Sequence, residues 1–368
     1  MTSSTERSQK PLLVYGSSIS YFTGKLEAYL RYKEIPYQLV PMTPLVRNKV
    51  GRRTGATQMP AVELPDGRWM TDTTPMIDWF ESQHPEPAVL PRDSLQAFAS
   101  RLVEDYADEW LWRPALHYRW SYRNDALLLS RRIVDEMMPR VPLPGSLKRF
   151  GIRQRQLRRY VRGDGITAET RDHVEGIYLR SLDQLAAIFA SRPFLLGAQP
   201  TLADFGFFAS TFRHFGLDPT PAAIMLRRAP AVYEWLARLW NARGSQLAGA
   251  LDAGIPPDWS PIFREIGDAY LPYLCANAAT WKARERRFDF EIQGTLYRAL
   301  PVSRYRVWCL EKLRAHFEAL PDDARAGATS LLEAHGCWEP LWRVDAPASG
   351  HDATGEAPFV RGLPVFGA

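Results

Sequence analysis

Residues 58–81 read QMPAVELPDGRWMTDTTPMIDWFE, and the interpretation of the rest of the chain starts from them. Two short β-prone runs within residues 61–71 flank a Pro-Asp-Gly sequence, which is typical of a tight turn. The polar residues 72–74 offer N-caps for a helix, and Pro75 suits a first helical turn. Apolar residues then recur at helical spacing. The stretch therefore predicts a β-hairpin that leads directly into a helix.

The segments before this stretch predict a small α/β domain. Residues 12–16 (LLVYG) are typical of a buried strand, and a helical pattern follows from Tyr21 to Lys33. Residues 37–40 suit a second strand, and residues 47–53 are expected to form a basic loop. Strand, helix, strand, hairpin and helix is the thioredoxin-like order. We therefore expect a thioredoxin-like domain over residues 10–84.

Several of these residues resemble the glutathione-binding half of cytosolic glutathione transferases. Met59-Pro60 matches the family's Val-Pro, whose proline is cis, and Asp72-Thr73 matches its acidic-hydroxyl pair. The resemblance implies that the Met59 backbone pairs with the cysteinyl part of glutathione as an added strand would. It also implies that Asp72 and Thr73 hold the γ-glutamyl end at a helix N-terminus, where the helix dipole favours a carboxylate.

The resemblance places the reactive end of the site before the first helix, within YGSSISYFTGK. Setting Lys25 against the family's basic residue puts Ser20 where many thioredoxin-like proteins carry a nucleophilic cysteine. A hydroxyl there can donate to the sulfur of glutathione and favour its thiolate, whose usual pKa is about 8.5. Ser20 is the first choice for this catalytic hydroxyl. Tyr21 and then Ser18 are the alternatives, and all three can instead serve only as helix-capping or packing residues.

The rest of the chain predicts an all-α domain and an additional α+β extension. Proline-rich residues 85–91 separate the first domain from helical patterns over residues 93–254, where Thr201 and Asp204 match the family's buried capping box. Residues 255–345 are expected to contain two helices and a β-hairpin about Gly294, and residues 346–368 a flexible tail. Phe359 and Phe366 are the residues expected to hold the end of this tail.

Two further regions of the helical domain allow more than one interpretation. Tyr106 and Trp110, a helical turn apart, are candidates for a pocket that binds the second substrate, with core packing as the alternative. A basic insertion near residues 140–165 contains seven basic and no acidic residues between Lys148 and Arg162. Nucleic-acid or anionic-membrane binding is one interpretation. Because no nucleic-acid-binding motif accompanies the insertion, a solvated, mobile segment is the interpretation that we adopt.

Composition limits the remaining classes of function. The chain of 368 residues contains no apolar run long enough for a membrane span, and residues 1–10 lack the apolar core of a signal peptide. Its three cysteines and seven histidines have no metal-ligand spacing, so we expect no metal. We find no phosphate-binding or nucleophile-elbow motif. These observations favour a cytoplasmic protein without a nucleic-acid partner.

The resemblance as a whole implies a glutathione transferase with a role in detoxification. Glutathione is its expected co-substrate, a small hydrophobic electrophile its second substrate, and a homodimer its expected assembly. A non-catalytic glutathione-binding or protein-interaction scaffold of the same fold is the alternative. A glutathione-dependent reductase is disfavoured, because Ser20 stands where such an enzyme needs a cysteine thiolate.

Overall fold

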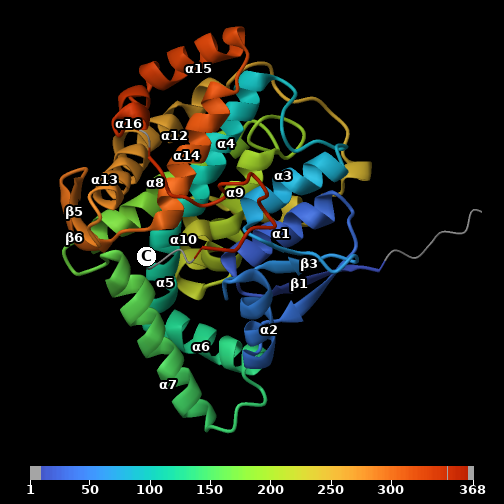
Figure 1. The fold of residues 1–368 in the computed structure, drawn as a ribbon, viewed down its shortest axis with the longest axis vertical. Helices are drawn as coiled ribbons and strands as arrows, with labels where there is room; N and C mark the ends of the chain where they lie inside the picture. Colours follow the sequence, from blue (N-terminus) through green and yellow to red (C-terminus); the bar gives the residue numbers. More distant parts are fainter. Residues whose placement is uncertain (1–9, 346, 364–368) are drawn as a thin grey trace, which may run out of the picture.

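The computed structural model of the protein describes residues 10–345 and 347–363. Residues 1–9 and Phe366, for which we made sequence predictions, lie outside the described residues. Figure 1 shows an α/β layer on one side of the molecule and a larger set of helices beside and above it. None of the helices within the described residues is long and apolar enough to cross a membrane.

The N-terminal domain contains a four-stranded sheet of order β2-β1-β3-β4. β1 is parallel to β2 and antiparallel to β3, and β3 is antiparallel to β4. The elements of this domain are β1 (Leu12–Gly16), α1 (Tyr21–Tyr32), β2 (Tyr37–Pro41), α2 (Pro44–Thr54), β3 (Ala61–Glu63), β4 (Trp69–Thr71) and α3 (Thr73–Gln83). This order confirms the thioredoxin-like prediction.

The alternation of side chains along β1 explains how helices cover both faces of the sheet. Leu12 and Val14 belong to the main core with α1 and α3, whereas Tyr15 packs with Val50 of α2 in a smaller cluster. Figure 1 shows α1 and α3 on the side of the sheet that faces the other helices, with α2 on the opposite side. One face of the sheet therefore joins the main core, which continues through the helical domain, and the other face forms a small cluster with α2.

The prediction of a loop at residues 47–53 was wrong, because α2 passes through them. The Thr43 hydroxyl accepts a hydrogen bond from the Val46 N–H (3.5 Å), and Pro44 occupies the first turn of the helix. Gly55 ends the helix with a φ of 77°, a conformation that glycine adopts without a steric penalty. Arginines in the segment had indicated a loop, whereas these capping residues determine a helix.

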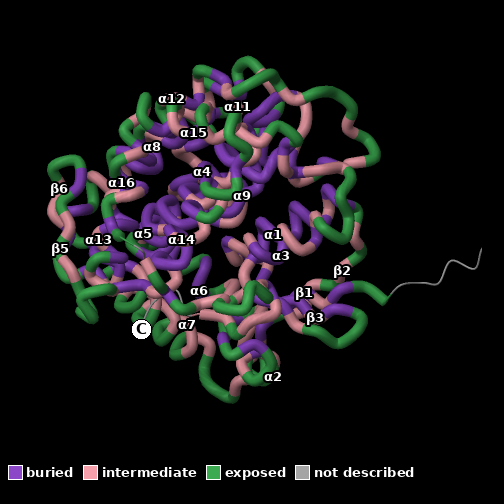
Figure 2. The backbone as a smooth tube through the Cα atoms, turned by 45° about the horizontal axis from the view of Figure 1, so that its top comes forward, coloured by how far each residue is buried: buried purple, intermediate pink, exposed green. Residues whose placement is uncertain are grey.

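The second domain is helical, as predicted. Its elements are α4 (Ser94–Trp110), α5 (Trp112–Ser121), α6 (Arg123–Met137), α7 (Gly145–Gln156), η1 (Leu157–Val161), η2 (Arg162–Asp164), α8 (Arg171–Phe189), α9 (Leu202–Ser210), η3 (Thr211–Phe215), α10 (Pro219–Arg228), α11 (Pro230–Asn241) and η4 (Gly244–Gln246). Figure 2 shows the buried stretches concentrated where α4, α5 and α9 meet. Gly206 of α9 allows this close packing, since a Cβ there would lie 2.7 Å from the Cα of Glu104 on α4.

The extension adds helices and a two-stranded sheet. Its elements are η5 (Pro257–Trp259), α12 (Ser260–Glu265), η6 (Ile266–Tyr270), α13 (Leu271–Lys282), β5 (Arg287–Ile292), β6 (Thr295–Pro301), α14 (Arg304–Glu318), α15 (Asp322–Ala334) and α16 (Trp338–Trp342). The predicted hairpin is present, and both Gln293 and Gly294 have positive φ at its turn. The α14 and α15 helices pack against α4 of the helical domain.

The predicted capping box at the start of α9 is also present. The buried Asp204 carboxylate accepts hydrogen bonds from the N–H groups of Thr201 (2.9 Å) and Leu195 (3.0 Å) and from the Trp235 indole (3.3 Å). One carboxylate therefore joins three segments of the helical domain. Burial raises its pKa to about 6, although the N–H groups act in the opposite direction.

We expect Asp204→Ala to lower the free energy of unfolding by about 3 kcal/mol or more, because it leaves several buried donors without an acceptor. Asp93 caps α4 through a single bond to the Gln96 N–H (2.8 Å) and is exposed. Asp93→Ala is therefore the control, with an expected loss of about 1 kcal/mol. Urea denaturation measures both, and equal losses would contradict the structural role of the buried box.

Candidate functional site

The strand register brings the predicted site residues to one end of the sheet. Ala61 at the start of β3 pairs with Tyr15 near the end of β1 and with Thr71 at the end of β4. The loop after β1, the Met59–Pro60 bond before β3 and the turn after β4 therefore adjoin one another. The Met59–Pro60 bond is cis, as the resemblance implied. Among the described residues, the Met59 backbone has no hydrogen-bond partner.

Ser20 stands at the N-terminus of α1, in the loop after β1. Its hydroxyl oxygen accepts a hydrogen bond from the Thr23 N–H (3.4 Å), and its side chain is half-buried. No acceptor for its hydroxyl hydrogen occurs among the described residues. Ser20 therefore caps the helix and still keeps a donor for a ligand, at a helix end that favours negative charge.

The two alternative hydroxyls have partners within the protein. The Ser18 hydroxyl donates to Glu136 of α6 (2.6 Å), which also accepts from the Ser18 N–H (2.8 Å). The Tyr21 side chain is buried, and its hydroxyl donates to the Ala107 carbonyl (2.8 Å). Burial raises the pKa of Tyr21 well above its usual value. These contacts favour Ser20 over both alternatives, although the role of Ser20 itself stays a prediction.

Three charged residues of the helical domain hold the Ser20 loop, and sequence analysis missed all of them. Arg119 donates to the Ile19 carbonyl (2.8 Å), Arg213 donates to the Ser18 carbonyl, and Glu136 binds Ser18 as described above. Asp218 orients Arg119 through both of its carboxylate oxygens (2.7 and 3.0 Å). The only signal in the sequence was charge within otherwise apolar helical patterns, which does not identify a distant partner.

Asp72 lies at the turn before α3, but it does not cap that helix as we predicted. Its φ is 72°, and its side chain makes no capping bond to the first turn. Instead, Oδ1 accepts a hydrogen bond from the Tyr305 hydroxyl of α14 (3.2 Å). The Oδ2 atom is buried and has no partner among the described residues. Burial raises the Asp72 pKa to about 7, and the Tyr305 bond lowers it in part.

The C-terminal segment contacts the same end of the sheet. The Pro358 carbonyl accepts from the Thr71 N–H on the outer edge of β4 (3.1 Å), and the Gly362 N–H donates to the Thr54 carbonyl (2.9 Å). The Phe359 ring packs against Trp79 of α3, with a centroid distance of 5.7 Å. The stretch that we expected to be flexible therefore makes defined contacts beside the turn that carries Asp72. Phe359, which we predicted to hold the end of the tail, makes this contact with α3.

A buried ion-pair network connects the site to the helical domain. The Lys25 ammonium on α1 binds the carboxylates of Glu104 and Asp108 on α4, and Glu104 also accepts from the Thr74 hydroxyl on α3 (2.6 Å). Burial acts to lower the Lys25 pKa, but the two carboxylates raise it above its usual value. Glu104 of α4 therefore contacts both the helix that follows Ser20 and the helix that follows Asp72, and Asp108 adds a second contact to Lys25.

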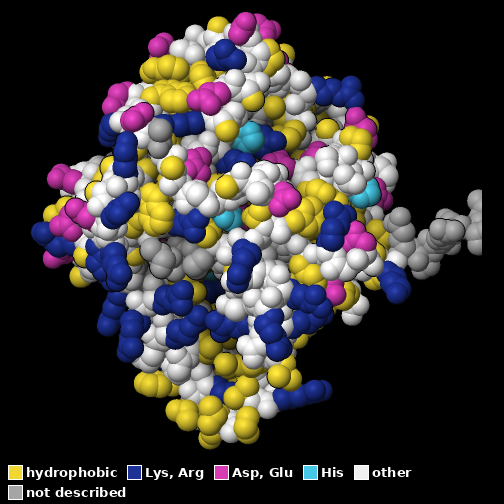
Figure 3. Space-filling model, viewed as in Figure 1, with side chains coloured by type: hydrophobic (Ala, Val, Ile, Leu, Met, Phe, Trp, Pro, Cys, Tyr) yellow, Lys and Arg dark blue, Asp and Glu magenta, His cyan; other side chains and the backbone are white. Residues whose placement is uncertain are grey.

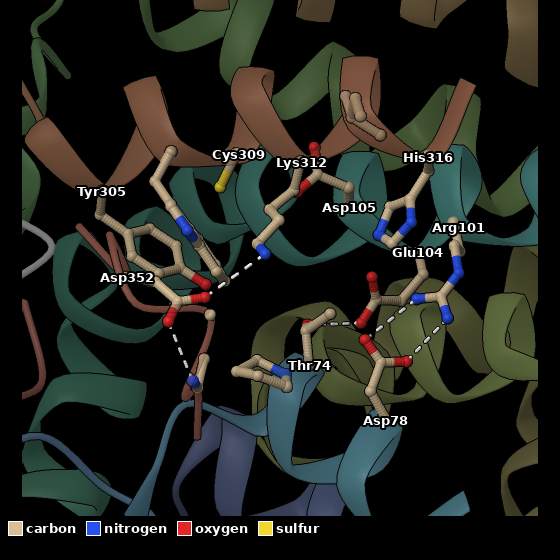
Figure 4. A pocket seen from close by; sticks show the side chains of 15 residues that line it. Thr74, Asp78, Arg101, Glu104, Asp105, Tyr305, Cys309, Lys312, His316 and Asp352 are labelled. Carbon is tan, nitrogen blue, oxygen red and sulfur yellow. Dashed lines mark hydrogen bonds and ion pairs between the residues drawn. The ribbon is translucent and has the colours of Figure 1, made fainter. Parts of the chain in front are cut away.

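A polar cavity of about 130 Å³ lies beside this network. It is enclosed by the first turns of α3, by α4, by α14 and by the C-terminal segment. Figure 4 shows two charged pairs pointing into it, Arg101–Asp78 (2.8 Å) and Lys312–Asp352 (3.4 Å). Ser20 and Met59 do not line it. Trp308 and Leu313 also line the cavity, so its walls combine charged and apolar side chains.

Of the two interpretations of Tyr106 and Trp110, a pocket wall or core packing, the structure supports core packing. Both side chains are 1% exposed, and both pack against Tyr270, with ring centroids 5.9 and 6.4 Å apart. The pocket assignment was therefore wrong, and the core-packing alternative is correct. The sequence could not distinguish the two, because the residue that fills the space lies in a separate segment of the chain.

Comparison with known families agrees with this geometry. Residues 14–88 match the model of the glutathione S-transferase N-terminal domain, and residues 168–238 match that of the C-terminal domain. The chain belongs to the glutathione transferase superfamily. This result confirms the family that the Met59-Pro60 and Asp72-Thr73 motifs indicated. A search of curated proteins found no match.

Several solved structures resemble part of the chain. A glutathione S-transferase from Methylobacterium radiotolerans, in complex with glutathione sulfonate, is 18% identical, covers 67% of this chain and 100% of its own, and has a TM-score of 0.40. The β-etherase LigF from Sphingobium sp. strain SYK-6 is 20% identical, covers 62% of this chain and 95% of its own, and has a TM-score of 0.46. At these values, the two structures carry no argument about activity.

We expect Lys25→Met to lower the free energy of unfolding by about 3–5 kcal/mol, because it leaves buried carboxylates without their cation. The Lys49–Glu63 pair (2.9 Å) is partly exposed and provides the control. Lys49→Met should cost at most about 1 kcal/mol. Thermal and urea denaturation measure both losses. A loss for Lys25→Met no larger than that for Lys49→Met would show that the buried network does not hold the two domains together.

Proposed function

We propose that this protein binds glutathione and conjugates it, through its sulfur, to a small apolar electrophile, with Ser20 as the catalytic residue. The observation that carries the proposal is the hydroxyl of Ser20, which keeps an unused donor among the described residues. It lies at a helix N-terminus and at the sheet end shared with the cis Met59–Pro60 bond and Asp72. Family membership supports a transferase-type function in general, and the specific reaction is our proposal.

The groups around this end of the sheet fit the parts of glutathione. The buried Asp72 Oδ2 atom has no partner among the described residues and can accept from the ammonium of the γ-glutamyl group. At the start of α3, Pro75 has no N–H and the Met76 N–H donates to the Asp72 carbonyl (3.1 Å), so the Thr73 and Thr74 N–H groups would meet the γ-glutamyl carboxylate. The Met59 N–H and C=O can pair with the cysteinyl backbone. Each of these groups would otherwise lack a partner, which is a reason to expect a ligand.

The chemistry assigned to Ser20 is stabilisation of a thiolate. A donor beside the sulfur favours the charged form, and a shift of about one or two pKa units from 8.5 makes a large thiolate fraction available at neutral pH. The thiol proton leaves to solvent, and the sulfur then forms a bond to carbon while the leaving group departs. Holding both reactants in one site supplies the rest of the rate gain.

The alternative is a glutathione-binding or protein-interaction scaffold without turnover. Two observations favour it: Tyr305 of the extension engages Asp72, and Pro358 occupies the adjoining edge of β4. Bound glutathione would have to lie beside both Tyr305 and Pro358. Calorimetric titration with glutathione, together with conjugation of an aryl halide, separates the two functions. Binding without conjugation would favour the scaffold.

The homodimer implied by the resemblance and the cytoplasmic location inferred from composition stay predictions. The extension already covers part of α4, so the surface available to a second copy differs from that of a shorter chain. Light scattering of the purified protein measures the assembly directly.

We expect Ser20→Ala to lower kcat/KM for conjugation by about 10- to 100-fold, because the thiolate loses a hydrogen bond worth about 1.5–3 kcal/mol. The ultraviolet absorbance of the bound thiolate should titrate at a higher pH in the variant. Ser82→Ala is the control, since Ser82 is exposed on α3 and its hydroxyl donates only to the Trp79 carbonyl (2.7 Å). Conjugation that is unchanged by Ser20→Ala would remove Ser20 from the mechanism and leave the binding site as a separate question.

We expect the affinity for S-methylglutathione, whose sulfur does not titrate, to rise as the pH increases from about 5.5 to 7.5. The raised pKa of Asp72, about 7, means that the carboxyl is largely protonated below this value and must lose its proton to pair with an ammonium. Affinity should therefore fall about tenfold for each pH unit below the pKa.

Asp72→Asn should abolish this dependence and weaken binding at pH 7.5. Tyr305→Phe removes the donor that lowers the Asp72 pKa, so it should move the transition to higher pH. Titration calorimetry at several pH values measures all three proteins. An affinity of the unaltered protein that does not change with pH would exclude Asp72 as the ammonium partner.

A further inference from the structure

The helical hairpin formed by α6, the loop 138–144 and α7 projects from the rest of the molecule. Figure 1 shows α7 at one end of the protein, away from the extension and from most of the helical domain. None of the residues of α7 is buried. The helix packs against α6 and continues into η1. Ile152 is partly buried and packs against the main core, but none of the twelve residues of α7 is fully buried, so much of the helix surface is open to solvent.

The hairpin exposes large apolar side chains. Leu143, Leu147 and Phe150 are 51%, 53% and 53% exposed, and we call these three residues the apolar tip. Leu147 and Phe150 are three positions apart and share one face of α7. Figure 3 shows hydrophobic side chains gathered at this end of the molecule, with Lys and Arg side chains above them. Contiguous exposed apolar side chains of this kind mark interaction sites.

Basic residues accompany the apolar tip without compensating acids. Residues 148–162 contain seven basic and no acidic residues, and Arg155, Arg158 and Arg159 are exposed. Among the described residues, no carboxylate forms an ion pair with any of the seven. Lys148 instead donates to the carbonyls of Met138 (3.1 Å) and Val141 (3.3 Å), and Arg153 donates to the Ser130 hydroxyl (3.2 Å). These bonds hold the hairpin together and leave the remaining guanidinium groups uncompensated.

We propose that the apolar tip and the basic residues 148–162 dock on the surface of an anionic lipid bilayer. In this arrangement, Leu143, Leu147 and Phe150 enter the boundary between headgroups and acyl chains. The arginines of α7 and η1 pair with the anionic headgroups, as in other basic amphipathic helices that lie in a membrane interface. The protein is thereby attached to the membrane surface without crossing it. This inference does not depend on the proposed glutathione chemistry.

The same observations disfavour two other binding partners for the apolar tip and the basic residues. A nucleic acid would satisfy the arginines but would leave three large apolar side chains against phosphates and sugars. The nearby Tyr160 ring, which could stack on a base, already lies under Arg155 and Arg159 (5.9 and 5.7 Å). A second copy of the chain would bring two uncompensated basic surfaces together, which like-charge repulsion opposes.

Vesicle flotation tests this proposal with the full chain. We expect the protein to float with vesicles of equal parts phosphatidylglycerol and phosphatidylcholine, and not with vesicles of phosphatidylcholine alone. Raising the salt from about 0.05 to 0.5 M should reduce binding about tenfold or more, because surface charges are screened. Equal binding to both kinds of vesicle would overturn the proposal.

Two sets of substitutions separate the apolar and the charged contributions. Leu147→Ser with Phe150→Ser, and Arg155→Gln with Arg158→Gln and Arg159→Gln, should each reduce binding to the anionic vesicles at least tenfold. Leu226→Ser is the matched control, because Leu226 is 50% exposed on α10, outside the hairpin. All of these side chains are exposed, so the melting temperatures should remain unchanged and the variants should fold.

The remaining outcomes each overturn the proposal. Vesicle binding that survives the Leu147 and Phe150 substitutions would mean that the apolar tip does not enter the bilayer. Duplex DNA bound more tightly than the vesicles, and unaffected by those two substitutions, would assign the basic residues to a nucleic acid. Self-association that those substitutions abolish, without any vesicle binding, would assign the tip to a second copy of the chain.

Discussion

The buried ammonium of Lys25 is the interaction on which the arrangement of this protein depends. It contacts Glu104 and Asp108 of α4, and Glu104 also accepts from the Thr74 hydroxyl. One residue of the helical domain therefore orients both α1, which carries Ser20, and α3, which follows Asp72. Gly206 lets α9 pack directly on the backbone of Glu104, so this carboxylate has little freedom to move. Without the cation, two carboxylates would face each other in the core.

Segments of the C-terminal extension and tail contact residues of the proposed glutathione site. Tyr305 reaches the Asp72 carboxylate from α14, and Pro358 pairs with the edge of β4. Tyr270 fills the space beside Tyr106 and Trp110 where we had expected a second-substrate pocket. The extension therefore adjoins the proposed site: burial raises the pKa of Asp72, and the hydroxyl of Tyr305 lowers it in part.

Two errors in the sequence predictions have the same physical origin. Aspartate is a preferred N-cap residue, but the Asp72 carboxylate accepts a hydrogen bond from Tyr305 of α14 and makes no capping bond to α3. Tyr106 and Trp110 have the spacing of a pocket wall, but the extension covers them. The α2 error differs in kind, because Thr43, Pro44 and Gly55 were visible capping signals that the density of arginines obscured.

Local sequence determined the strands and the first and third helices of the first domain, the hairpin in residues 61–71 and the capping box at Thr201 and Asp204, and the resemblance implied the cis Met59–Pro60 bond. These features depend on residues a few positions apart, where turn and capping preferences act directly. Only the tertiary structure decided which hydroxyl keeps a donor and what holds the Ser20 loop. The partners concerned, such as Glu136 and Arg213, are more than a hundred positions away, and no local preference encodes such a contact.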